Sequence, residues 1–138
     1  MKNVVVIDGQ SGRMGQLFIQ KAKAAELNCT YTAIGTNAIA TAAMLKAGAA
    51  QGATGENPVL VACRTADIIV GPIGILVADA MLGEVTEKMV LAIGRSSAKK
   101  LLLPVNQCGN LIAGTQNLSL SRVMEEAVAV LTTLCNEV

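Results

Sequence analysis

Three glycines with regular spacing follow a run of β-branched residues near the start of the chain. After Val4-Val5-Val6-Ile7 the sequence continues Asp8-Gly9-Gln10-Ser11-Gly12-Arg13-Met14-Gly15. Glycines let a backbone approach a phosphate closely, and the start of a following helix offers free N–H groups and a partial positive charge. The segment therefore predicts a phosphate-binding loop, to which Arg13 would add a cation. The alternative is a tight strand-to-helix turn that needs glycine and binds nothing.

The predicted second strand ends in Gly35-Thr36-Asn37, without an acidic residue. Domains that bind NAD usually carry Asp or Glu there, which accepts hydrogen bonds from the ribose hydroxyls. Thr36 and Asn37 are candidates to bond a ribose or to tolerate a 2′-phosphate, and equally to cap the next helix. The missing acid weakens the prediction of ordinary NAD and leaves NAD(P) or another nucleotide as the candidate cofactor.

Two further side chains are candidates for catalysis. Glu56 lies in a glycine-rich segment and would serve as acid, base, metal ligand or ribose acceptor; the alternative is an exposed loop carboxylate. Cys108 follows a predicted strand, and its thiol would be nucleophilic only if a helix end or a lysine lowered its pKa.

Gly71-Pro72 ends another predicted strand and would allow close backbone approach to a ligand.

The sequence contains no histidine. Ser-His and Cys-His catalysis and a zinc site of His and Cys are therefore excluded within the chain. No pair of the four cysteines has C-x-x-C spacing, and most are expected to be small core residues. No metal site is predicted, and a redox or metal role remains the minor alternative for Cys29, Cys63, Cys108 and Cys135.

Charge and aromatic content bear on the partners. The net charge is +1, and no basic run suggests nucleic-acid binding. Phe18 and Tyr31 are the only aromatic residues, too few for a base-stacking platform. The longest uncharged apolar stretch, 68–78, is far shorter than the roughly 20 residues of a membrane helix, and the chain starts with a strand rather than a signal peptide. We expect a cytoplasmic protein with a small-molecule ligand, binding neither nucleic acid nor membrane.

Hydrophobic periodicity predicts strands and helices in alternation, which is typical of a doubly wound parallel sheet. The predicted strands cover 4–7, 31–34, 68–70 and 101–105. The predicted helices cover 13–26, from Thr36 or Asn37 to about Ala47, 75–82, 86–93, and a last one from Ser119 or Ser121.

Other segments are less distinctive. Gly48–Pro58 is expected to be a loop, and Asn28 a left-handed helix stop. The stretch 59–63 suits a strand or a helix, and a helix capped by Asn57 is favoured because Pro58 fits its first turn. A short edge strand is expected at 111–113.

These elements predict an α/β fold, with residues 1–138 forming a single Rossmann-like domain around a doubly wound, mostly parallel sheet of about four to five strands. Ligands of such sheets bind outside the carboxyl ends of the strands. The candidate cofactor-binding residues at that edge are Gly9, Gln10, Ser11, Gly12, Arg13, Met14, Gly15, Gly35, Thr36, Asn37, Gly71 and Pro72.

The chain is unusually apolar, with 52% hydrophobic and 15% charged residues, against about 25% charged residues on average. Apolar surface in excess of one core favours a homo-oligomer. The alternative is a sheet covered on both faces, which uses apolar residues within one chain.

Residues 7–16 resemble the nucleotide loop of dihydrodipicolinate reductases, through Gly9, Gly12, Arg13, Met14 and Gly15. The resemblance covers only about a tenth of the chain. It implies a phosphate loop of the nicotinamide-dinucleotide type. It does not imply reductase activity, because those enzymes have a second, tetramer-forming substrate domain with a histidine motif.

Over nearly its whole length the chain resembles a family of small uncharacterised bacterial proteins of unknown function. The segments that carry this resemblance are 6–10, 35–41, 53–57, 69–75 and 81–84. No activity follows from it. The expected function is binding of a nucleotide, an NAD(P)-like dinucleotide or another phosphate-bearing molecule at the sheet edge, with catalysis left open; the alternative is a non-catalytic, oligomeric metabolite-binding or regulatory protein.

Overall fold

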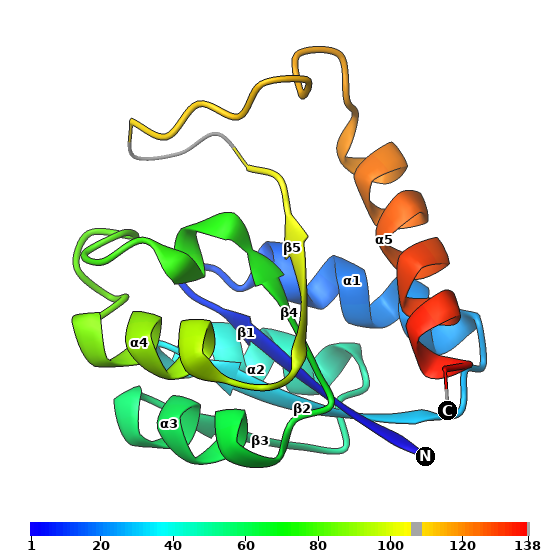
Figure 1. Ribbon diagram of the computed structural model, residues 1–138, viewed down its shortest axis with the longest axis horizontal. Helices are drawn as coiled ribbons and strands as arrows, with labels where there is room; N and C mark the ends of the chain where they lie inside the picture. Colours follow the sequence, from blue (N-terminus) through cyan, green and yellow to red (C-terminus); the bar gives the residue numbers. More distant parts are fainter. Residues whose placement is uncertain (106–108, 138) are drawn as a thin grey trace.

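The computed structural model describes residues 1–105 and 109–137 of the chain. Within them, five parallel strands form one sheet in the order β3-β2-β1-β4-β5 (Figure 1). The strands are β1 (Lys2–Asp8), β2 (Cys29–Gly35), β3 (Gln51–Thr54), β4 (Ile68–Pro72) and β5 (Lys99–Leu103). The predicted Rossmann-like, doubly wound α/β fold is confirmed.

Helices cover both faces of the sheet (Figure 1). One face packs against α1 (Arg13–Ala24), α2 (Ala38–Ala47) and α5 (Leu120–Cys135). The other face packs against α3 (Glu56–Thr65), the 3₁₀ helix η1 (Ile73–Leu76) and α4 (Glu87–Arg95).

The alternation of β1 side chains explains its unbroken apolar sequence. Val4 and Val6 are buried in the cluster that contains Phe18 of α1. Val5 and Ile7 are buried in the opposite cluster, which contains Ile93 of α4. A strand covered on both faces needs no polar side, so the doubly covered sheet takes up much of the chain's apolar content.

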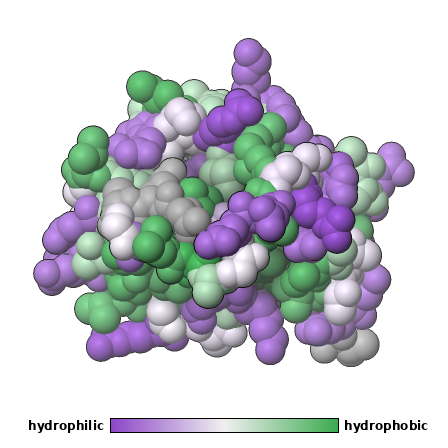
Figure 2. All heavy atoms as spheres, turned by 90° about the horizontal axis from the view of Figure 1, so that it is seen from above, coloured by the Kyte–Doolittle hydropathy of each residue, from purple (hydrophilic) through white to green (hydrophobic). Residues whose placement is uncertain are grey.

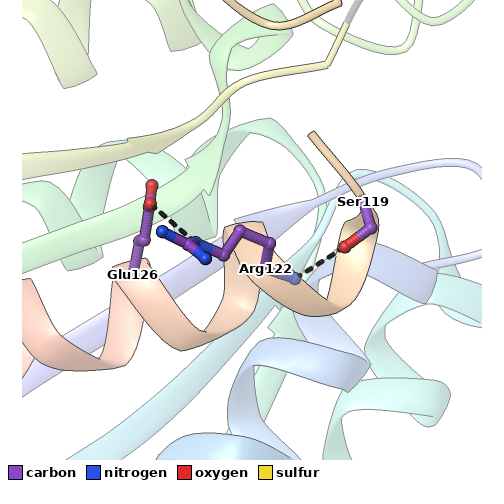
Figure 3. Close-up of polar contacts among 3 residues, drawn as sticks. All are labelled: Ser119, Arg122 and Glu126. Carbon is purple, nitrogen blue, oxygen red and sulfur yellow. Dashed lines mark hydrogen bonds and ion pairs between the residues drawn. The ribbon is translucent and has the colours of Figure 1, made fainter. Parts of the chain in front are cut away.

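Side-chain caps begin three helices where the sequence suggested them. Asn37, rather than Thr36, caps α2, since its Oδ1 accepts a hydrogen bond from Ala40 N at 2.9 Å. Thr86 caps α4 in the same way. Ser119, rather than Ser121, caps α5, and Figure 3 shows its hydroxyl accepting from the amide of Arg122.

The segment 48–58 corrects the expected loop, because it contains β3. This strand pairs with β2 from Thr32 to Gly35 but lies at the sheet edge with all four residues exposed. Exposed, glycine-containing edge strands lack the apolar run that marks a buried strand. The favoured helix at 59–63 is confirmed as part of α3, although Gly55 is its N-cap instead of Asn57.

Three further expectations were wrong in detail. The helix expected at 75–82 is replaced by the short η1 and a series of turns up to Gly83 and Glu84. Residues 111–113 form no strand. The left-handed residue after α1 is Glu26 (φ 52°) rather than Asn28. Isolated glycines and short apolar runs distinguish poorly between turns and regular elements.

The carboxyl ends of the parallel strands form one edge of the twisted sheet; in Figure 1 β4 and β5 end toward the top, β1 toward the upper left and β2 toward the left. Residues 109–119, which precede α5, lie at the top of the same view. Figure 2 views the molecule from above and shows hydrophobic and hydrophilic residues interspersed over that face. Ligands of open parallel sheets bind at the edge formed by the carboxyl ends of the strands.

Candidate functional site

The glycine loop connects the carboxyl end of β1 to the start of α1. Gly12 adopts a left-handed conformation (φ 73°), and a Cβ there would lie 2.7 Å from the Cα of Ala40 in α2. A Cβ at Gly9 would collide with the side chains of Thr36 and Met81. Close packing against α2, β2 and the 77–86 loop thus already requires these glycines, whatever the loop binds.

The buried carboxylate of Asp8 holds the loop from below. Its Oδ1 accepts a hydrogen bond from Gly9 N and its Oδ2 one from Gly15 N, both at 2.8 Å. The side chain is only 3% exposed. Burial raises the pKa of Asp8, and these amide bonds oppose the rise only in part; the charge of Glu84 raises the pKa further. The chain's own carboxylate thus occupies amides at the start of α1 that a bare phosphate loop would leave free.

Glu84 joins three separate parts of the edge. Its Oε1 accepts hydrogen bonds from the backbone N of Gln10 (2.9 Å), the hydroxyl of Thr36 (2.7 Å) and the side-chain amide of Asn37 (2.8 Å). Burial alone would raise the pKa of Glu84, but the three hydrogen bonds outweigh it and lower the pKa. The loop after η1 therefore places a stable carboxylate at the end of β2.

The sequence alone did not identify Glu84 as a residue of the candidate site. Its partners lie 47 to 74 positions away in the chain, so no local pattern could reveal the contact. The one signal was that the segment 81–84 carries the resemblance to the bacterial family.

The loop that carries Glu84 is strained. Asp79, Met81 and Leu82 have φ values between 58° and 66°, and Gly83 follows at 90°. Left-handed non-glycine residues cost about 1–2 kcal/mol each. Such strain persists only where surrounding contacts impose it and is common at functional sites. Here the buried Met81 and the hydrogen bonds of Glu84 fix the loop over Gly9 and Gln10.

Replacing Leu82 with glycine should stabilise the protein. Leu82 is 94% exposed, so the change removes no core packing and relieves the left-handed strain. The gain, after the larger chain entropy of glycine, is about 0.5–1 kcal/mol. Urea denaturation would measure it, with Leu82→Val as the matched variant that should destabilise; equal stabilities for all three proteins would contradict a strained loop.

A small pocket of about 190 Å³ opens above the loop. Its lining combines the β1 end, the loop, β4 and the strained segment: Asp8, Gly9, Gln10, Ser11, Arg13, Met14, Pro72 and Met81. Arg13 and Ser11 are exposed. Among the residues that the structure describes, their side chains and backbone N–H groups form no hydrogen bond. These are donors available to a ligand.

The structure brings six of the twelve predicted cofactor residues into direct contact with this pocket, five from the loop and Pro72 from β4. Gly12 and Gly15 pack beneath the loop, and Gly35 and Gly71 lie where a Cβ would strike Thr41 or the carbonyl of Ile7. Thr36 and Asn37 lie at the same edge but hold Glu84.

Of the two candidate catalytic residues, Glu56 and Cys108, the structure describes only Glu56. Glu56 is half-buried in the first turn of α3 and accepts a hydrogen bond from the hydroxyl of Thr86, the cap of α4. It does not line the loop pocket and instead links two helix starts. Cys108 lies outside the described residues.

The thiols of Cys63 and Cys135 are poor nucleophiles. Burial raises the pKa of Cys63, and burial with a neighbouring Cys29 raises that of Cys135 to about 11. Cys29 donates a hydrogen bond to the hydroxyl of Tyr31 at 3.1 Å. In the described parts of the chain, no three His, Cys, Asp or Glu side chains come together as metal ligands, and no helix has the length and apolar character to cross a membrane.

Known proteins offer few matches. No curated protein matches the chain. A solved structure, a dodecameric FMN-dependent Ubix-like decarboxylase from Escherichia coli O157:H7, has a TM-score of 0.45 and 16% identity, and the alignment covers 97% of this chain and 76% of that one. A likeness this distant carries no functional argument. The family model described as Domain of unknown function (DUF3842) matches residues 3–136. The chain therefore belongs to this family.

Proposed function

We propose that the pocket above the glycine loop binds the phosphate group of a small molecule, with a nucleotide as the favoured class. The observation that carries this proposal is the pair of unpartnered donors, Ser11 and Arg13, at the start of α1. Arg13 supplies a guanidinium suited to phosphate oxygens. The α1 dipole adds favourable potential at the same point.

The pocket accommodates a phosphate but not a whole nucleotide. Its volume of about 190 Å³ is below the roughly 300–1,000 Å³ typical of complete ligand sites. Met81 and Glu84 cover the side of the loop nearest β2, so the phosphate must enter on the Ser11 side. The rest of the ligand then lies outside the pocket along the polar sheet edge.

Glu84 bears on the choice between dinucleotides. It places a carboxylate beside Thr36 at the end of β2, where NAD-binding domains usually carry the acid that bonds the ribose. A negative charge there repels a 2′-phosphate. If the ligand is a dinucleotide, NAD is therefore favoured over NADP, the reverse of what Thr36 and Asn37 alone suggested.

Calorimetric titration with AMP, ATP, NAD and NADP tests the proposal. At least one should bind, and Arg13→Gln should weaken it about tenfold or more, as expected for loss of a charge-assisted hydrogen bond. Ser11→Asp should abolish binding by introducing a like charge. Arg122→Gln is the matched control, because Arg122 pairs with Glu126 on α5 away from the pocket. No binding by any nucleotide, or equal binding by Arg13→Gln, would refute the proposal.

A second candidate function is binding of the nucleotide without catalysis. Asp8 and Glu84 are both engaged in hydrogen bonds, and the described thiols whose pKa is raised stay protonated at neutral pH. Among the described residues that line the pocket, none is a free general base. Recovery of the bound nucleotide chemically unchanged after prolonged incubation would favour a binding or regulatory module, whereas a converted product would favour an enzyme.

A further inference from the structure

A second cleft lies between the last turns of α3 and α4. Its volume is about 500 Å³, and its lining includes Cys63, Arg64, Arg95, Ser96 and Ser97. The ends of α3 and α4 lead directly into the first residues of β4 and β5. The cleft is therefore at the amino ends of the strands, opposite the glycine loop.

The two arginines of the cleft lack carboxylate partners. Within 1–105 and 109–137, the one ion pair joins Arg122 to Glu126 (Figure 3). Glu126 lies four positions after Arg122, whereas the residue four positions after Arg64 is Ile68 and that after Arg95 is Lys99, so neither has a partner of the Arg122 type. Two guanidinium groups thus share one cleft, and none of the described residues that line it carries a carboxylate.

Capping of the helix ends does not account for these arginines. Ser96 Oγ donates a hydrogen bond to the carbonyl of Cys63 at 2.8 Å. Lys100 Nζ donates to the carbonyls of Ser96 (2.7 Å) and Ala98 (3.2 Å). These three carbonyls already have donors other than the arginines, and Lys100 places a third positive charge next to Ser96 of the cleft.

We propose that this cleft binds a small organic anion through phosphate or carboxylate groups held by Arg64 and Arg95. Planar guanidinium groups bind such oxyanions with two parallel hydrogen bonds. The exposed hydroxyl of Ser97 is a further donor at the cleft. A volume of about 500 Å³ lies within the range of metabolite sites, and Leu60 and Ala92 supply apolar walls for the rest of the molecule.

The site is independent of the glycine loop, because it lies at the other edge of the sheet and shares no lining residue with the loop pocket. The thiol of Cys63 stays neutral, since burial raises its pKa and the nearby Lys100 only partly offsets this. The cleft therefore binds its anion reversibly, without covalent chemistry.

Titration with inorganic pyrophosphate and, separately, with citrate tests the proposal and distinguishes phosphate from carboxylate recognition. At least one probe should bind saturably and shift backbone amide NMR signals at 63–65 and 95–98. The double variant R64Q/R95Q should weaken that binding by about tenfold or more. Ser97→Asp, which keeps both arginines, should weaken it as well.

Two control variants separate this site from other sources of binding. Arg122→Gln removes the same charge from α5 on the other face of the sheet, and it should leave the titration unchanged. Arg13→Gln removes the cation of the glycine loop; it should leave the NMR shifts at 63–65 and 95–98 unchanged, even where the loop itself loses pyrophosphate. The proposal is overturned if neither probe shifts the signals at 63–65 and 95–98, if R64Q/R95Q shows these shifts at the same concentrations as the parent protein, or if Arg13→Gln alone abolishes them.

Discussion

Replacing Asp8 with alanine is expected to lower the free energy of unfolding by about 2–4 kcal/mol at neutral pH. The change leaves the N–H groups of Gly9 and Gly15 without their acceptors in a buried site. Each unsatisfied buried donor costs about 1–3 kcal/mol, and relief of the buried charge offsets part of the total. Urea denaturation followed by circular dichroism measures the difference.

The stability difference between the parent protein and Asp8→Ala should also depend on pH. The pKa of Asp8 in the fold lies above the ordinary 3.8, mainly because of burial. The folded protein therefore binds this proton more tightly than the unfolded chain does, so acidification favours the folded state of the parent protein at this group. The parent protein should therefore exceed Asp8→Ala in free energy of unfolding by an amount that grows as the pH falls through the raised pKa of Asp8. This difference should be largest below pH 3.8.

Asp8→Asn is the conservative companion. It keeps one acceptor for the loop amides and removes the buried charge, so it should lose less stability than Asp8→Ala. A stability advantage of the parent protein that shrinks on acidification would show that the pKa of Asp8 is lowered. Equal stability of Asp8→Ala and the parent protein would show that the carboxylate does not hold the loop.

The elements that sequence reasoning located correctly are those whose signal is local. Val4–Ile7 is apolar because both its faces are covered, and Asn37, Thr86 and Ser119 cap helices through neighbouring amides. The strand β3 was missed because it has no buried face to give it an apolar pattern. Its place in the sheet comes from pairing with β2, which is a tertiary contact.

The candidate site was predicted in position but not in content. The alternation of strands and helices and the glycine loop pointed to the carboxyl edge of the sheet, where Pro72 and the loop line one pocket. What fills the edge depends on contacts across the chain: Glu84 reaches Gln10, Thr36 and Asn37 through a strained turn. Such a contact leaves no periodicity or spacing in the sequence, and neither does the meeting of Arg64 with Arg95.

Replacing Gly12 with alanine is expected to lower the free energy of unfolding by about 3 kcal/mol or more. Two costs coincide at this residue. Its φ of 73° is unfavourable for alanine, and the new Cβ would lie 2.7 Å from the Cα of Ala40 and 2.9 Å from its carbonyl oxygen. Backbone atoms cannot turn aside as a flexible side chain can, so α1 and α2 must move apart. Thermal and urea denaturation would measure the loss.

Gly83→Ala separates the two costs. Gly83 also has a positive φ, of 90°, but no atom lies within 4 Å of the position of its Cβ. Alanine there should lower the free energy of unfolding only through the left-handed backbone conformation, by about 1 kcal/mol. A loss at Gly12 no larger than that at Gly83 would mean that α2 does not press on the loop. In that case close packing would no longer explain Gly12, and the need for a ligand to approach the backbone would remain as the reason for glycine there.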